Sequence, residues 1–233
     1  MAADDKHAEK AREFAALVLE GLPRFEAAGP SDCDDAKTIY FVRHGEATHN
    51  VAPRPWGPEL IDAPLTDVGR AQAETLQAIT RRVEQDIEVV IVSPLTRAIQ
   101  TALIGFSTLA ERGDFPFIAM EECRERFGKN LPDKRRCRSA LATEFDRVDF
   151  TGIGEADELF LDDERESAEA LSRRADAFLA MLHARPEKGI AVVCHSSFLC
   201  ALTNATLRTA AAPELGAWFA NAEMRQVRLR KVS

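Results

Sequence analysis

The sequence predicts an α/β fold, a three-layer sandwich in which a mostly parallel central sheet carries helices on both faces and a small cap or insertion. Two observations support this prediction. Short apolar runs rich in β-branched residues, typical of strands buried on both faces, recur at 38–42, 88–93, 115–120 and 190–194. Segments with apolar residues at helical spacing lie between these runs, and such alternation of strand and helix is typical of parallel-sheet proteins.

Composition and charge restrict the class of protein. The chain has 233 residues, of which 45% are apolar and 29% charged, as in an ordinary soluble globular protein. The net charge of −8 argues against nucleic acid as a partner, and any anion site must depend on locally concentrated arginines. Five scattered cysteines predict reduced, mostly buried thiols and a cytoplasmic protein. The charged start and the absence of a long apolar run predict neither a signal peptide nor a membrane partner.

The internal helices are predicted from their start signals and apolar stripes. Thr66 is a natural N-cap for a helix that runs to about residue 85. Its opening pattern, Leu-Thr-x-x-Gly-x-x-Gln-Ala, is interpreted as structural. Pro94 suits the first turn of the next helix, and a further helix with an apolar face is expected from 167 to about 182.

Each end of the chain is expected to add one element. Residues 7–21 indicate an amphipathic helix on the outside of the domain, followed by a loop at 29–32. The apolar side of this helix carries Phe14, Leu17 and Val18. The segment 224–232 alternates apolar and charged residues, which predicts a strand at an edge of the sheet, with antiparallel pairing to the rest allowed.

Cations and imidazoles follow three of the predicted strands. Arg43-His44-Gly45 ends the first, Arg97 lies in the helical turn after the second, and His195 ends the last of the apolar runs. Catalytic groups of open α/β sheets lie at the carboxyl ends of strands, so these side chains are expected to meet at one edge. Arginine offers a fork of donors for phosphate or carboxylate, and histidine can act as a nucleophile or a general base.

Three motifs carry a resemblance to a known family. They are Arg43-His44-Gly45-Glu46 followed by Thr48 and Asn50, the string Ser-Pro-Leu-Thr-Arg-Ala-x-Gln-Thr-Ala from Ser93, and His195 at a strand end. Together they resemble the histidine phosphatase superfamily, in its phosphoglycerate-mutase-like branch, over residues 38–208. The resemblance implies a single phosphoglycerate-mutase-like domain over 1–233, with an N-terminal helix and loop at 1–35 and a cap or insertion at 121–166.

The resemblance also implies a role for each motif residue. His44 would be the nucleophile, giving a phosphohistidine, while Arg43, Arg97 and His195 hold the phosphoryl oxygens and Asn50 adds a neutral donor. Transfer of a dianionic phosphoryl group needs concentrated positive charge, and here the arginines and His195 would supply it. No metal ion and no cofactor is therefore expected.

The general acid is less clearly marked. The family places a glutamate shortly before an aromatic residue and a glycine, most often four residues before the glycine. That position, counted back from Gly128, is Arg124. Glu125 is therefore the preferred acid, and Glu121, just after the strand at 115–120, is the alternative.

Two segments of the sequence each allow two interpretations. The loop at 51–64 contains four prolines and Trp56, and it either lines the mouth of the site or is a surface connection with one buried aromatic ring. The basic run at 134–138 is either a solvated face or a contact to the non-reacting end of an anionic substrate.

Three functions compete for this set of residues. The first is a phosphomonoester hydrolase that acts on a small phosphorylated metabolite through phosphohistidine; the second is a phosphoglycerate-type mutase; the third is a catalytically inactive phospho-ligand-binding module. The complete Arg/His set argues against the third. The chain lacks the string Leu-Asn-Glu-Arg-His-Tyr-Gly of the cofactor-dependent glycolytic mutases, which argues against the second. The hydrolase is favoured, and the sequence predicts neither its particular substrate nor an oligomeric state.

Overall fold

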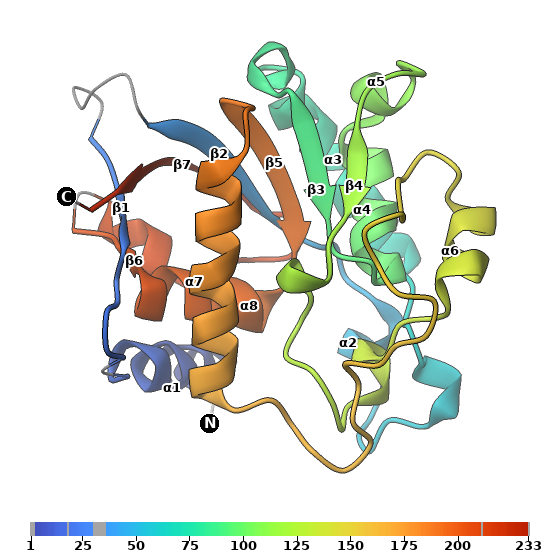
Figure 1. The fold of residues 1–233 in the computed structure, drawn as a ribbon. Coiled ribbons are helices and arrows are strands. Elements are labelled where there is room, and N and C mark those ends of the chain that lie inside the picture. The colour runs from blue at the N-terminus through green and yellow to red at the C-terminus, as the bar shows by residue number, and fades with distance from the viewer. Residues whose placement is uncertain (1–2, 18, 30–35, 211, 233) are drawn as a thin grey trace.

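A twisted seven-stranded sheet lies at the centre of the molecule. The computed structural model describes residues 3–17, 19–29, 36–210 and 212–232, and within them the sheet has the order β4-β3-β5-β2-β7-β1-β6 (Figure 1). The strands are β1 (Phe25–Ala27), β2 (Lys37–Arg43), β3 (Val89–Val92), β4 (Phe117–Ala119), β5 (Gly189–Cys194), β6 (Leu207–Arg208) and β7 (Met224–Lys231). Strands β4, β3, β5 and β2 pair in parallel, and β7 is antiparallel to β2 and β1.

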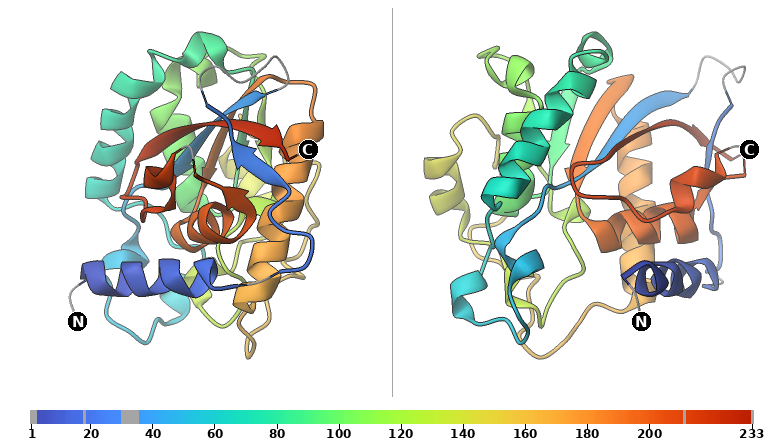
Figure 2. Two further views of the ribbon diagram at one scale, coloured as in Figure 1. Left: turned by 90° about the vertical axis from the view of Figure 1, so that its left-hand side faces the viewer. Right: turned by 180° about the vertical axis from the view of Figure 1, so that it is seen from behind.

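Helices cover both faces of this sheet. They are α1 (Ala3–Ala15), α2 (Thr48–Val51), α3 (Asp67–Thr80), α4 (Thr96–Gly105), α5 (Ser107–Ala110), α6 (Arg138–Glu144), α7 (Ala168–Ala184) and α8 (Ser196–Ala201). Figures 1 and 2 show α7 and α8 on one face and α3 and α4 on the other. The α/β sandwich with a mostly parallel sheet is thus confirmed.

Alternate residues of the central strands build two separate cores. In β2, Ile39 and Phe41 pack in the core under α7 and α8, whereas Tyr40 and Val42 pack in the core under α3 and α4. This follows from the period of two in a strand, which sends successive side chains to opposite faces. All six residues of β5 are buried, as the continuous apolar run at 190–194 predicts for a strand with helices on both sides.

The N-terminal helix differs from its prediction. Helix α1 spans Ala3–Ala15 rather than 7–21, because the chain turns soon afterwards to enter β1, which the sequence analysis missed. Phe14 is fully buried as expected, whereas Leu17 lies beyond the end of the helix. Val18, and residues 30–35 of the expected loop, lie outside the described residues.

Strand β7 is antiparallel, but the prediction that it forms an edge of the sheet is wrong. It lies between β2 and β1, and β6 extends the sheet further. The two strands beyond it have only three and two residues, too short to show a period-two pattern in the sequence. Val227 and Leu229 are buried, as the alternation along β7 predicts.

The segment 121–166 packs beside the outer strand β4 and helix α4. Leu141, Phe145 and Phe150 join the core on the α4 side, and Asp149 forms a parallel bridge to Ile118. Figure 1 shows this segment along one side of the molecule, descending below the carboxyl ends of the strands. The segment therefore brings residues from outside the sheet to the edge where the site is expected.

The basic run at 134–138 matches neither of its two interpretations. Arg135 is 4% exposed, and its guanidinium donates to Glu121 and to backbone carbonyls between residues 154 and 156. Arg136 pairs with Asp62 and Glu144. Most ion pairs of the run therefore hold the segment 121–166 together, and Arg136 joins it to the rest of the fold through Asp62.

Composition led to two further expectations, one about the cysteines and one about membrane-spanning segments. Of the four cysteines described, Cys123, Cys194 and Cys200 are buried and Cys137 is exposed, all as free thiols. Cys33 lies outside the described residues. No helix in the described part of the chain is sufficiently long and apolar to cross a lipid bilayer.

A close backbone contact fixes the turn after β2 against helix α3. A Cβ atom on Gly69 would lie 1.9 Å from the carbonyl oxygen of Glu46, so only glycine fits. Thr66 caps α3 by accepting from the Gly69 N–H at 3.0 Å and donates to the Glu46 carboxylate at 2.7 Å. The Glu46 N–H donates to Gln72 at 2.8 Å. The pattern interpreted as structural thus holds the turn that carries His44.

This contact predicts a difference between two glycine substitutions. Gly69→Ala should lower the free energy of unfolding by about 1–3 kcal/mol, because the added methyl group forces the turn and α3 apart. Gly113→Ala is the control, since a Cβ there meets nothing within 4 Å. Urea denaturation of both variants measures the difference, and a Gly69→Ala protein as stable as the control would contradict the account.

Candidate active site

Strand pairing brings two histidines together. His44 directly follows β2 and His195 directly follows β5, and these neighbouring parallel strands pair with Arg43 opposite Cys194. The two imidazole rings are consequently 5.0 Å apart between centroids, and both side chains are buried. The two histidines that the sequence placed at strand ends therefore share one site.

The hydrogen bonds of His44 define its protonation. Its Nδ1 lies 2.6 Å from the carbonyl oxygen of Gly45, which can only accept, so Nδ1 carries the proton. Nε2 then keeps a lone pair and accepts from Arg97 Nε at 3.3 Å. Burial, and then the charges of Arg97 and His195, hold the pKa of His44 well below its usual value. His44 is therefore a neutral imidazole with a lone pair on Nε2, the form that a nucleophile requires.

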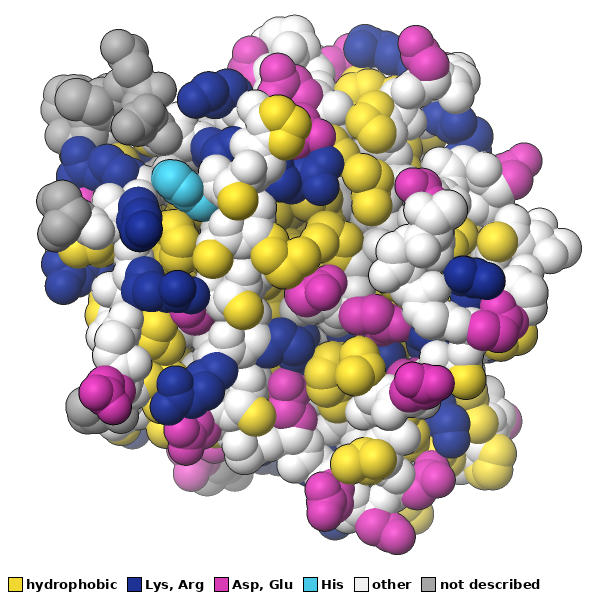
Figure 3. All heavy atoms as spheres, viewed as in Figure 1, with side chains coloured by type: hydrophobic (Ala, Val, Ile, Leu, Met, Phe, Trp, Pro, Cys, Tyr) yellow, Lys and Arg dark blue, Asp and Glu magenta, His cyan; other side chains and the backbone are white. Residues whose placement is uncertain are grey.

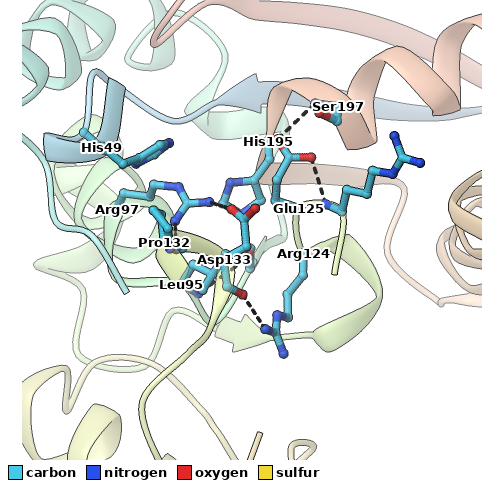
Figure 4. A network of polar contacts seen from close by, with 12 residues as sticks. His49, Leu95, Arg97, Arg124, Glu125, Pro132, Asp133, His195 and Ser197 are labelled. Carbon is cyan, nitrogen blue, oxygen red and sulfur yellow. Dashed lines mark hydrogen bonds and ion pairs between the residues drawn. The ribbon is translucent and has the colours of Figure 1, made fainter. Parts of the chain in front are cut away.

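Arg97 lies in the first turn of α4 and is fully buried. Besides its contact with His44, it donates to the Pro132 carbonyl at 2.7 Å and pairs with Asp133 at 2.9 Å (Figure 4). Asp133 also pairs with Arg165 at 2.9 Å. All three nitrogens of the guanidinium are thus engaged, which fixes its plane beside the His44 ring.

His195 and Arg43 each present a buried polar atom to the site region. His195 Nε2 lies 2.7 Å from the hydroxyl of Ser93, which follows β3, and its Nδ1 is buried with no partner among the described residues. Arg43 donates to the Phe219 carbonyl at 2.7 Å, whereas its Nε is likewise buried and unpartnered within the described part of the chain. Buried polar groups almost always have a partner, so these two atoms are suited to hold an anion, His195 in the tautomer with its proton on Nδ1 and Nε2 accepting from the Ser93 hydroxyl.

The structure separates the two glutamates proposed as the acid. Glu125 is 8% exposed and lines the cavity described below. Its carboxylate accepts from the backbone N–H groups of Arg126 at 2.9 Å and Ser197 at 3.1 Å. Glu121 instead pairs with Arg124 at 2.9 Å and with Arg135 at 2.7 Å, and it is not part of the cavity lining.

Glu125 is ionised in this environment. Burial raises the pKa of its carboxyl group, but the ammonium of Lys10, the two backbone N–H groups and the charge of Arg165 have the larger combined effect and lower the pKa to about 2. A negative charge is therefore stable at this position as long as the surrounding cations are not neutralised.

A cavity of about 530 Å³ opens beside these groups. It is lined by Lys6, His7, Lys10, Arg43, His49, Asn50, Ala52, Arg54, Trp56, Glu125, Arg126, Asn130, Asp133, Arg165, Ser196, Ser197 and Trp218. The loop at 51–64 contributes three of these residues, which favours its interpretation as part of the site mouth. The basic run at 134–138 contributes none.

Asn50 and His49 form one further part of the lining. Asn50 Oδ1 accepts from the Ala47 N–H at 2.9 Å, and its amide nitrogen lies 3.1 Å from His49 Nε2. His49 is 8% exposed, and burial together with the charge of Arg97 lowers its pKa to about 2. The sequence analysis assigned no role to His49, although its position one residue before Asn50 in the same motif was a signal for it.

The site residues Arg43, His44, Asn50, Arg97, Glu125 and His195 therefore come together, and Glu121 does not. Among the described residues, no three His, Cys, Asp or Glu side chains are grouped so as to hold a metal ion. Two histidines and one arginine at the ends of neighbouring parallel strands, with a second arginine in the helical turn after β3, define a class of phosphate-handling protein.

The chain belongs to the histidine phosphatase superfamily (branch 1), whose family model matches residues 39–231. It is 35% identical to phosphoglycerate mutase-like protein 1 of Arabidopsis thaliana, over 82% of this chain and 80% of that protein. It is 33% identical to a probable phosphatase of Schizosaccharomyces pombe, over 68% of this chain and 74% of that protein. A mycobacterial glucosyl-3-phosphoglycerate phosphatase has the same fold, with a TM-score of 0.53 and 20% identity over 84% of this chain and 97% of that one.

Three buried neutral histidines should make the fold less stable in acid. The pKa values of His44, His49 and His195 lie below the usual 6.5, so below that pH the unfolded chain binds protons that the folded protein does not. The free energy of unfolding should therefore fall as pH falls, by up to about 1.4 kcal/mol per pH unit for each histidine.

Urea denaturation between about pH 7.5 and 5.5 measures this slope. His49→Gln should make the slope shallower by the contribution of one histidine, since glutamine does not titrate. An unchanged slope in His49→Gln would show that His49 is not held neutral by the fold.

Proposed function

We propose that this protein is a phosphomonoester hydrolase that acts on a small phosphorylated metabolite through a phosphohistidine at His44. The observation that carries the proposal is the neutral His44 ring, with its Nε2 lone pair beside the guanidinium of Arg97 and next to His195. Membership of the histidine phosphatase superfamily and the likeness to a probable phosphatase support it.

In the first step, His44 Nε2 attacks phosphorus, and the bond from phosphorus to the leaving oxygen breaks. In the second, water attacks phosphorus, the P–N bond breaks and its electron pair returns to Nε2, releasing inorganic phosphate. Arg43, Arg97 and His195 hold the non-bridging oxygens, and Asn50 adds a neutral donor. Arg97 Nε exchanges its contact with Nε2 for a phosphoryl oxygen, which frees the nucleophile. The arginines supply the positive charge, so the proposal includes no metal ion.

Glu125 is proposed as the group that protonates the leaving oxygen and then takes a proton from water. Its low pKa is set by surrounding cations, and a dianionic phosphoryl group bound beside it would oppose that effect and raise the pKa. Asp133 also lines the cavity, but both of its oxygens are paired with arginines. We assign Asp133 to the positioning of Arg97.

A panel of phosphate monoesters, with interconversion of 2- and 3-phosphoglycerate assayed beside it, tests the proposed function. The wild-type protein should release phosphate in the presence of a metal chelator, and a folded His44→Ala protein should not. Interconversion without hydrolysis would favour the mutase, in agreement with the names of the plant relatives. Hydrolysis by folded His44→Ala at the wild-type rate would overturn the mechanism.

The acid is identified by comparing leaving groups. An alkyl phosphate leaves as a basic alkoxide that needs a proton, whereas p-nitrophenyl phosphate leaves as a weakly basic phenolate. Glu125→Gln should therefore lose about 10²–10⁴-fold on alkyl phosphates and much less on the aryl substrate. This holds provided that dephosphorylation of His44 does not limit both reactions.

Glu121→Gln and Asp133→Asn are the controls for this comparison. Glu121→Gln should have a mild effect on both substrates, and Asp133→Asn should reduce both rates equally, because it acts through Arg97. A selective loss on alkyl phosphates in either control, rather than in Glu125→Gln, would move the role of the acid to that residue.

A further inference from the structure

The cavity contains more positive charge than one phosphoryl group requires. Its lining includes six lysine and arginine side chains and only two carboxylates, in a chain whose net charge is −8. The reacting phosphoryl group is a dianion, and the proposed mechanism assigns it to Arg43, Arg97 and His195. Arg165 is already paired with Asp133. Four cations of the lining are therefore assigned neither to the reacting phosphoryl group nor to a direct ion pair: Lys6, Lys10, Arg54 and Arg126.

Two of these cations come from helix α1. Lys6 and Lys10 are four residues apart, so they project from the same face of the helix. Helix α1 packs on α8, the helix that directly follows His195. Lys10 Nζ donates to the hydroxyl of Ser197 at 2.7 Å, across 187 positions of the sequence. Figure 2 shows α1 lying across the end of the molecule that holds the strand ends.

Within the described part of the chain, three of these cations form no direct ion pair, although the charge of Lys10 acts on the carboxylate of Glu125. Among the residues that the structure describes, no ion pair within 4.0 Å joins Lys6, Lys10 or Arg54 to an acidic group. Arg54 instead stacks on Trp56, with its guanidinium 4.0 Å from the ring centroid. Like charges four residues apart repel each other on a helix, and an anion bound between Lys6 and Lys10 would relieve that repulsion.

The cavity also has room beyond the reacting group. Its volume of about 530 Å³ is in the range that encloses most of a small organic ligand, rather than one phosphoryl group. The cations of α1 and of the loop at 51–64 line this same cavity.

We propose that the substrate carries a second phosphoryl group, separated from the reacting one by a sugar-sized body and bound by Lys6 and Lys10 with Arg54 and Arg126. The subsite rests on the proposed phosphatase function and specifies its substrate class. Lys6 and Lys10 lie before the residues that the family model matches, 39–231, whereas Arg54 and Arg126 lie within them, so only the lysine half of this subsite lies outside the matched region.

The test compares glucose 6-phosphate with glucose 1,6-bisphosphate as matched substrates. The wild-type protein should show a kcat/KM at least about tenfold higher for the bisphosphate, as expected for additional charge-assisted contacts. The double variant Lys6→Ala/Lys10→Ala should lose most of this ratio. The ratio is the readout, because Lys10 also lies close enough to Glu125 to lower its pKa and can change both rates together.

Arg12→Ala is the matched control, since it removes one positive charge from α1 at a position outside the cavity lining. It should keep the wild-type ratio. Lys6→Glu changes a single exposed side chain without disturbing packing, and it should lower the ratio further than Lys6→Ala. Circular dichroism of all variants confirms that α1 remains folded.

The outcomes separate the two proposals. If the wild-type protein hydrolyses none of glucose 6-phosphate, glucose 1,6-bisphosphate and p-nitrophenyl phosphate, the proposed phosphatase function is wrong, and the proposed subsite is wrong with it. If it hydrolyses monophosphates but shows no preference for the bisphosphate, only the subsite is overturned. The same conclusion follows if the double variant keeps the wild-type ratio.

Discussion

The parallel pairing of β2 with β5 is the constraint on which the site depends. It places His44 and His195 in equivalent positions at one edge of the sheet, with their rings 5.0 Å apart. The Gly45 carbonyl then fixes the proton of His44 on Nδ1, and the contact between Gly69 and Glu46 fixes the turn itself. Backbone geometry, rather than an adjacent side-chain base, therefore sets the reactive form of the imidazole.

Buried charges set the protonation states of the site. Buried arginines are costly unless they are paired, and Arg97 is stabilised by Asp133, which Arg165 in turn supports. Burial, and then the same positive field, lowers the pKa of His44 and keeps it neutral, and against the effect of burial the field lowers the pKa of Glu125 and keeps it ionised. A bound phosphoryl dianion would reverse this effect at Glu125. In the proposed mechanism, one charge distribution would thus keep His44 ready as the nucleophile before binding and make Glu125 the acid after it.

The sequence predicted the groups at strand ends, because the apolar runs before Arg43-His44 and His195 mark parallel strands whose ends must meet. It did not predict Asp133 or the lysines of α1. These residues reach the cavity only through tertiary packing, as the contact between Lys10 and Ser197 shows. The role of the basic run at 134–138 was missed because the sequence does not show which carboxylates, such as Asp62 and Glu144, pair with it in the fold. Strands β1 and β6 were too short for a pattern to reveal them.

The location of the transferred phosphoryl group tests the central claim most directly. The protein, labelled with ¹⁵N-histidine, is mixed with substrate, quenched in alkali to preserve phosphohistidine, and studied by mass spectrometry and by ³¹P–¹⁵N coupling. The account predicts phosphorylation of His44 on Nε2, because Nδ1 is committed to the Gly45 carbonyl. A phosphoryl group on Nδ1 of His44, on His195 or on His49 would contradict it.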